Sequence, residues 1–339
     1  MAGVLKAVPE TARRGRDVPW RSICKVAVLE HRAGLASVAL LSAACLAALL
    51  IKGLGSTMSL AQFLRDGAEN TSALSVLDFV ALAFPAVIGI FMGAPLVSRE
   101  LETGTFRFTW TQAVGRTRFA RISALFLGVV SAVLACAVGV LLTWYAGKFE
   151  VLGIESRWQA GFFLASPIVL PALTLASLAF GVLVGTVVKR TVAAMAVTTI
   201  VTAGLLTALM TYLVRTLLSV SPLVTNRISP VGSIVGSLNS PVPSGRWPAG
   251  AWLVRGWLTG PDGRQLTSTD AVRVMHQITS QAKGAPSQVG LAHPQAFTFW
   301  VSYQPADRFW VFQLLLAAAL LGLAIAALAA TMRRIRAIG

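Results

Sequence analysis

Six long apolar stretches divide the chain, and they limit its fold more than any other feature of the sequence. They occupy residues 33–51, 74–97, 122–145, 162–188, 191–214 and 310–332. A helix needs roughly 20 mostly apolar residues to cross the hydrocarbon core of a bilayer. Inside lipid, every backbone N–H and C=O must be bonded within the protein, so such spans are helices. The sequence therefore predicts an all-α integral membrane protein with six transmembrane helices.

The composition agrees with a bilayer as the solvent. Of the 339 residues, 55% are hydrophobic and only 12% are charged, whereas soluble domains carry roughly 25% charged residues. The net charge is +16, and the positive residues cluster at the ends of the spans. Anionic lipid headgroups lie at that depth. We therefore expect membrane lipids as partners and no binding to nucleic acid, because no basic run is interleaved with aromatic residues.

The basic residues are distributed unevenly among the loops. One set of connections carries most of them: Lys6, Arg13, Arg14, Arg16, Arg21, Lys25 and Arg32 before the first span, Arg99, Arg107, Arg116, Arg118 and Arg121 after the second, Lys189 and Arg190 after the fourth, and Arg333, Arg334 and Arg336 in the tail. The opposite short loops hold only Lys52, Arg65, Lys148 and Arg157. Positive loops remain in the cytoplasm. The pattern predicts a multi-pass protein of the plasma membrane with both termini cytoplasmic.

The chain then divides into four parts. Residues 1–32 form a cytoplasmic N-terminal segment, 33–214 the first five helices, 215–309 an extracytoplasmic loop or cap, and 310–339 the sixth helix with a basic tail. The N-terminal segment is polar and basic without an early apolar core, so we expect the first span to act as an uncleaved signal anchor.

Two of these parts contain a further predicted helix. Residues 20–31 are amphipathic, which indicates either an interfacial elbow helix in the headgroup plane or a plain extension of the first span. The external part is rich in Ser, Pro and Gly. Within it, Thr269 or Asp270 could cap a helix whose apolar face is formed by Val272, Met275, Ile278 and Thr279.

Patterns that support catalysis are missing from the sequence. The phosphate-binding pattern Gly-x-x-x-x-Gly-Lys-Ser/Thr is absent. The histidines (His31, His276 and His293) and the cysteines (Cys24, Cys45 and Cys136) have no metal-ligand spacing. No Asp, Glu or His lies at mid-depth in a span, which argues against an ion-coupled carrier. We therefore expect no catalytic residue, no metal site and no cofactor on this chain.

The connection between the second and third spans is more informative. Gly93, Ala94 and Pro95 are expected to end the second span. Arg99, Glu100 and Glu102 then place charges at the water boundary, and Gly104 and Thr105 turn the chain. On physical grounds this connection is either a docking segment for a soluble partner or a solvated loop.

Two pairs of residues in the fourth span are also informative. Gly181 and Gly185 predict close helix packing, and Pro167 and Pro171 predict either a kink or static packing.

These residues carry a resemblance to a known family. Residues 92–105 read MGAPLVSRELETGT, residues 109–112 read TWTQ and residues 116–119 read RTRF. The run closely resembles the type-2 ABC transporter permeases of the exporter branch, particularly the actinobacterial group. Residues 29–32 (LEHR) and 303–310 (YQPADRFW) are similar to the same family. The resemblance covers both ends of the chain and the layout of the spans.

The resemblance implies a membrane-spanning permease subunit of an ATP-driven exporter. Its coupling helix, about residues 98–107, would touch a separate ABC ATPase that holds ATP and Mg²⁺. Arg99, Glu100 and Glu102 would be the polar contacts, with Gly104 and Thr105 at the turn. A second copy or a paralogue would complete the permease pair, and a hydrophobic or amphipathic cargo would suit the charge-poor spans. One departure is that the external loop lacks the paired cysteines of many relatives. The alternative function is a non-transporting scaffold or signalling anchor.

Overall fold

The computed structural model describes residues 20, 25–26, 28–29, 32–55, 79–103, 116–150, 158–213, 223–228, 251–260, 262–267, 269–270 and 298–337. Six helices within these ranges are long and apolar enough to cross a membrane: Gly34–Ile51, Phe79–Thr103, Ala120–Gly147, Val169–Val188, Thr191–Thr211 and Arg308–Arg336. Each of them overlaps one of the six predicted spans, and the predicted class, a helical integral membrane protein with six membrane-spanning helices, is confirmed. The chain forms two compact units, one of Met1–Met210 with Gln313–Gly339 and one of Thr211–Phe312.

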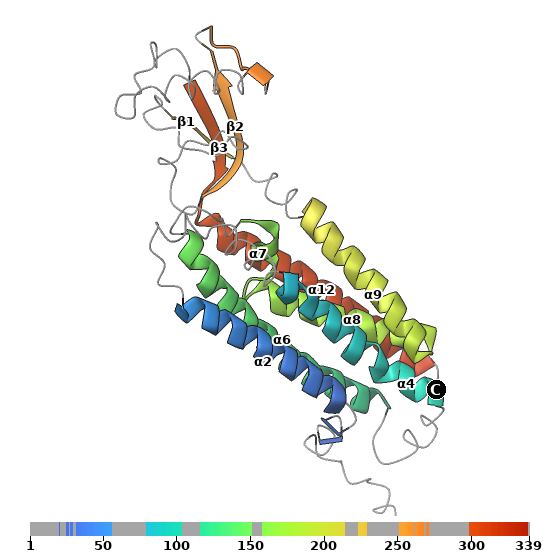
Figure 1. Cartoon of the computed structure of the whole chain (residues 1–339). Helices are drawn as coiled ribbons and strands as arrows, with labels where there is room; N and C mark the ends of the chain where they lie inside the picture. Colours follow the sequence, from blue (N-terminus) through green and yellow to red (C-terminus); the bar gives the residue numbers. More distant parts are fainter. Residues whose placement is uncertain are drawn as a thin grey trace, which may run out of the picture. The chain divides into compact units, whose positions relative to one another are not determined.

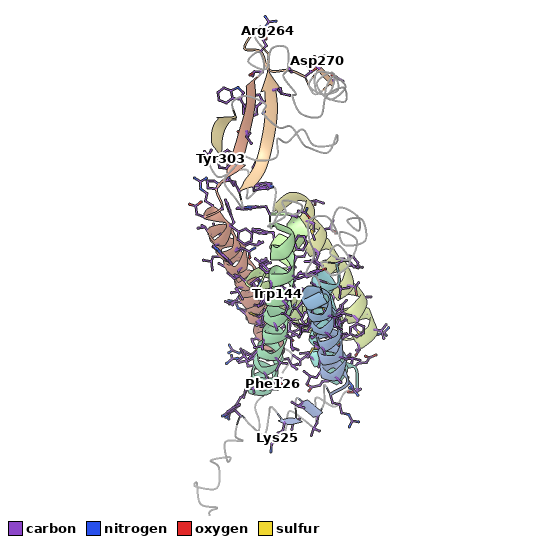
Figure 2. The ribbon with its side chains drawn as sticks, turned by 60° about the vertical axis from the view of Figure 1, so that its left-hand side comes forward. Lys25, Phe126, Trp144, Arg264, Asp270 and Tyr303 are labelled. Atoms are coloured by element: carbon purple, nitrogen blue, oxygen red, sulfur yellow. The ribbon has the colours of Figure 1, made fainter. Side chains whose placement is uncertain are left out.

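The first unit is a helical bundle organised around the fourth span. Its main helices are α2 (Arg32–Gly55), α6 (Arg116–Glu150), α8 (Val169–Val188) and α9 (Thr191–Ala208). Helix α8 packs against both α6 and α9, while α2 packs against α6 (Figure 1). Figure 2 labels Phe126 and Trp144, which lie toward opposite ends of α6. Large apolar side chains are exposed on the outer faces, including Leu40, Val129 and Ile200, as expected for surfaces that meet lipid.

The second span does not end where the sequence suggests. Residues 79–88 are helical, a π-helical turn η2 (Gly89–Gly93) follows, and α4 (Pro95–Thr103) continues directly from it. The expectation that Gly93, Ala94 and Pro95 terminate the helix is therefore wrong. A proline clashes with the carbonyl four residues earlier in a regular helix, but here Ala94 N–H donates to the Gly89 carbonyl at 2.9 Å. This wider turn leaves room for the Pro95 ring.

Glycines bring the second and fourth spans into backbone contact. A Cβ on Gly89 would lie 2.7 Å from the Ser177 carbonyl oxygen, and one on Gly93 would lie 2.6 Å from that of Leu178. On the opposing helix, a Cβ on Gly185 would lie 2.6 Å from the Ala94 carbonyl oxygen. No side chain fits at such distances. The close packing predicted for Gly181 and Gly185 is confirmed, with η2 and α4 as its partner.

The fourth span is broken near its start, which the predicted continuous helix 162–188 did not anticipate. A short helix α7 (Ala160–Leu164) precedes the break, and α8 begins at Val169. Pro167 has no N–H and so leaves the Phe163 carbonyl without its helical partner. The Gln313 side-chain amide donates to that carbonyl at 2.9 Å. Pro167 lies in the interruption between α7 and α8, whereas Pro171 lies within α8. Whether these prolines act as a kink or as static packing features stays open.

The break also holds the last helix, α12 (Arg308–Ala337), in place. The Ser166 hydroxyl donates to the Gln313 side-chain oxygen, and its oxygen accepts from the Val169 N–H at 3.2 Å. Both Ser166 and Gln313 are buried. Because each polar atom has a partner, the pair links α12 to the break without an unpaired group.

The second unit contains a three-stranded antiparallel sheet. Its strands β1 (Val224–Ile228), β2 (Trp252–Thr259) and β3 (Thr298–Gln304) have the order β1-β3-β2. Leu258, Val301 and Tyr303 are buried on one face of the sheet, and Ser302 and Gln304 are buried on the other. On the other face Trp257 lies opposite Trp300, with ring centroids 6.5 Å apart. The sequence predicts only a loop or cap here, so the sheet is a feature that the structure adds.

Two predicted helices fall largely outside the described residues. Of the proposed cap helix after residue 269, only Thr269 and Asp270 are described. Of the proposed elbow 20–31, only five positions are described, and these are helical. Both helices stay predictions.

Candidate functional site: the end of the second span

Helix α4 has one buried and one exposed side at the end of the second span. Leu96, Val97 and Ser98 are buried, and the Ser98 hydroxyl donates to the Ala94 carbonyl at 2.8 Å. Arg99 and Glu102 are exposed, whereas Glu100 is half-buried. The buried side packs against α8. The helix can therefore present charged groups to a partner while its other side is fixed in the bundle.

The next element at this end of the bundle is the turn between α8 and α9, which has only two residues. Lys189 adopts the left-handed conformation, with φ 59°, and its N–H donates to the Gly185 carbonyl at 3.3 Å. Arg190 is extended, with φ −124° and ψ 126°. Both side chains are exposed. They add two positive charges to the surface that Arg99 and Glu102 occupy.

A hydrogen bond joins α4 to the start of α9. The Glu102 carboxylate accepts from the Thr191 backbone N–H at 2.8 Å, although 89 residues separate the two in sequence. The first N–H groups of a helix have no partner within that helix. A carboxylate there also meets the positive end of the helix dipole. Figure 1 shows the end of α4 beside the start of α9.

The structure thus assembles part of the predicted site and adds to it. Arg99, Glu100 and Glu102 lie together on α4, which ends at Thr103. Gly104 and Thr105 lie outside the described residues. From the sequence, Lys189 and Arg190 are expected only to orient the chain in the membrane, and Thr191 has no expected role. A usable signal was present, because alternating spans place this short turn on the same membrane side as residues 98–107.

The ranges that the structure describes hold few other side chains that could bind a metal or react. They contain no group of three or more His, Cys, Asp and Glu side chains that could hold a metal ion. Cys45 is a buried free thiol and Cys136 a partly buried one. We therefore treat the surface formed by α4 and the α8–α9 turn as the candidate site and call it the α4 surface.

A family comparison covers this surface. The model for ABC-2 membrane transporter related proteins matches residues 25–215, which is more than half of the chain. The chain therefore belongs to the ABC-2 membrane transporter related family. With its six apolar helices it is a multi-pass membrane protein of the transporter permease type. No curated protein and no solved structure matches the chain.

Proposed function

We propose that this chain is the membrane-spanning permease subunit of an ATP-driven exporter, with ATP and Mg²⁺ bound by a separate ABC ATPase. The observation that carries the proposal is the α4 surface, which lies within the region that the family model matches. Permeases of the ABC-2 family work in general with an ABC ATPase. A short charged helix with one side fixed in the bundle is suited to receive force from such a partner.

The sequence assigns Arg99, Glu100 and Glu102 of α4 to contact with the ATPase, and Gly104 and Thr105 to the following turn. Arg99 and Glu100 keep the contact role in this proposal, whereas the role of Glu102 depends on its bond to Thr191. Force on α4 reaches the fourth span through backbone contact, because the Ala94 carbonyl and Gly185 approach too closely for any side chain. Closely packed backbones shift together rather than deform. Movement of α4 would therefore move α8 and the span that follows it.

Several finer features belong to the same proposal. The run at residues 92–105 supports the exporter branch and its actinobacterial group. The basic loops support a plasma membrane location with both termini cytoplasmic, so residues 1–32 would be inside and 215–309 outside. A second copy or a paralogue would pair with the chain. The exposed apolar faces are consistent with lipid contact and with a hydrophobic or amphipathic cargo.

Co-purification tests the proposal. The tagged chain is expressed with a candidate ABC ATPase, for example one encoded by a neighbouring gene, extracted in mild detergent and captured. A variant ATPase that lacks its Walker lysine serves as the hydrolysis control. We expect stoichiometric recovery of the ATPase, and ATP-dependent efflux in vesicles only with the active ATPase. Capture of the chain without any ATPase would contradict the proposal and favour the scaffold or signalling alternative.

A further inference from the structure

The bond between Glu102 and Thr191 gives Glu102 a different role from its neighbours on α4. We infer that Glu102 is a positioning residue that ties α4 to the first turn of α9, and that it is not itself a contact to the ATPase. The effect of this role on transport rests on the proposed function, in which the ATPase moves α4. The hydrogen bond between Glu102 and Thr191, which we call the tie, lies within this chain and does not depend on that function.

The geometry supports a tie rather than a free docking charge. The Glu102 carboxylate receives a backbone N–H at 2.8 Å, and it lies at the helix end where a negative charge is favoured. Thr191 is the first residue of α9, after Arg190 as its N-cap. The N-cap side chain makes no capping hydrogen bond. Glu102 therefore supplies the cap from another helix.

Helix α9 is also the kind of element that such a tie can move. Only 22% of its span is buried, compared with 61% for the span of α8. The residues buried along this span are Ala194, Thr198, Thr202 and Leu209. A helix with few buried contacts moves more easily than its neighbours. Helix α9 packs against α8, η2 and α4, and the two-residue turn of Lys189 and Arg190 is its chain connection to α8. A pull of α4 on Thr191 therefore acts beside the turn about which α9 can pivot.

Thr191→Pro tests the tie from its donor side. Proline has no N–H and is well tolerated at the first position of a helix. A residue before proline favours φ near −120° with ψ of about 120–160°, and Arg190 already has φ −124° and ψ 126°. The variant therefore removes the N–H that bonds the Glu102 carboxylate, together with the Thr191 hydroxyl that also interacts with it, while the backbone at Arg190 stays compatible.

Ala160→Pro is the matched control. Ala160 is the first residue of α7, and its N-cap Gln159 has φ −59° and ψ 138°, which also suits a following proline. No carboxylate cap is involved at that position. The series is completed by Glu102→Ala, by Glu102→Gln, which keeps an oxygen acceptor but loses the charge, and by the double variant Glu102→Ala with Thr191→Pro.

Amide hydrogen exchange on the chain alone, in lipid nanodiscs, gives the first readout. We expect the amides of residues 191–193 to exchange on the order of threefold to tenfold faster in Glu102→Ala than in the wild type. Glu102→Gln should fall between them. Exchange in Glu102→Ala equal to that of the wild type would overturn the tie.

The second readout uses the complex with the co-purified ATPase. We expect Glu102→Ala and Thr191→Pro to recover wild-type amounts of ATPase, while ATP-dependent efflux falls about fivefold in both. The double variant should fall no further, because one interaction is removed twice, and Ala160→Pro should match the wild type. Reduced ATPase recovery in either single variant, or normal efflux in Thr191→Pro, would overturn the inference. If the wild type recovers no ATPase, the proposed function fails, but the exchange measurement still decides the tie.

Discussion

The contact between the second and fourth spans predicts that Gly→Ala substitutions lower the melting temperature by amounts that depend on what the new methyl group meets. The critical substitution is Gly181→Ala. Its new Cβ would overlap the Gly89 carbonyl oxygen and lie 2.9 Å from the Ala94 nitrogen. Both obstacles are backbone atoms of η2 and its flank, so no side chain can rotate out of the way. The two helices must separate, and α8 loses contact along its buried face.

The size of the effect follows from the nature of the obstacle. Overpacking a filled core costs about 1–3 kcal/mol, and a backbone obstacle places Gly181→Ala at the upper end. For a chain of 339 residues, with an unfolding entropy of about 2.1 cal/mol/K per residue, that corresponds to a melting temperature lower by roughly 3–4 °C. Gly128→Ala should be milder, because its Cβ would meet the Leu175 Cδ2 at 3.1 Å, which is the end of a flexible side chain. Gly204→Ala should be neutral or stabilising, since nothing lies within 4 Å.

Thermal unfolding of the three purified variants, followed by size-exclusion chromatography of the detergent-solubilised protein, measures the series. The expected order of melting temperature is Gly181→Ala lowest, then Gly128→Ala, then Gly204→Ala at or above the wild type. Equal melting temperatures for Gly181→Ala and Gly204→Ala would refute the backbone contact between these spans.

Two further changes test other parts of the account. Gln313→Leu removes the amide that donates to the Phe163 carbonyl and the oxygen that accepts from the Ser166 hydroxyl, so we expect the free energy of unfolding to fall by about 1–3 kcal/mol in the same assay. Ser166→Ala combined with Gln313→Leu should be less harmful than the sum of the two, and full additivity would argue against a shared network. Glu100→Arg reverses a charge on α4, and we expect lower stimulated ATPase activity with normal membrane insertion. Unchanged stimulation would remove Glu100 from the docking site.

The sequence predicts the spans well because apolar length is a local property. It also singles out Gly181 and Gly185, since small residues at a four-residue interval indicate close packing. It cannot identify their partner, which depends on how the helices are arranged. Pro95 is misjudged for a related reason. Whether a proline ends a helix depends on the preceding turn, and a π-helical turn at Gly89–Gly93 is not evident from composition.

The remaining site features depend on distant contacts. Gln313 and Ser166 are 147 residues apart, and each alone is an ordinary polar residue at a span end. Glu102 and Thr191 meet only because α4 continues to Thr103. The sheet, by contrast, could have been predicted, because Thr298–Gln304 and Trp252–Thr259 are rich in the aromatic and branched residues typical of strands.

The most direct test of the central claim is the side of the membrane on which α4 ends. In a chain with Cys24, Cys45 and Cys136 replaced by alanine, single cysteines are placed at Arg99 and, as a control, at exposed Arg264 in the second unit. A membrane-impermeant maleimide is then applied to intact cells and to inverted vesicles. A permease driven from the cytoplasm predicts that Arg99→Cys reacts only in inverted vesicles and is protected by the bound ATPase, while Arg264→Cys reacts only in intact cells. Reaction of Arg99→Cys in intact cells would contradict the account.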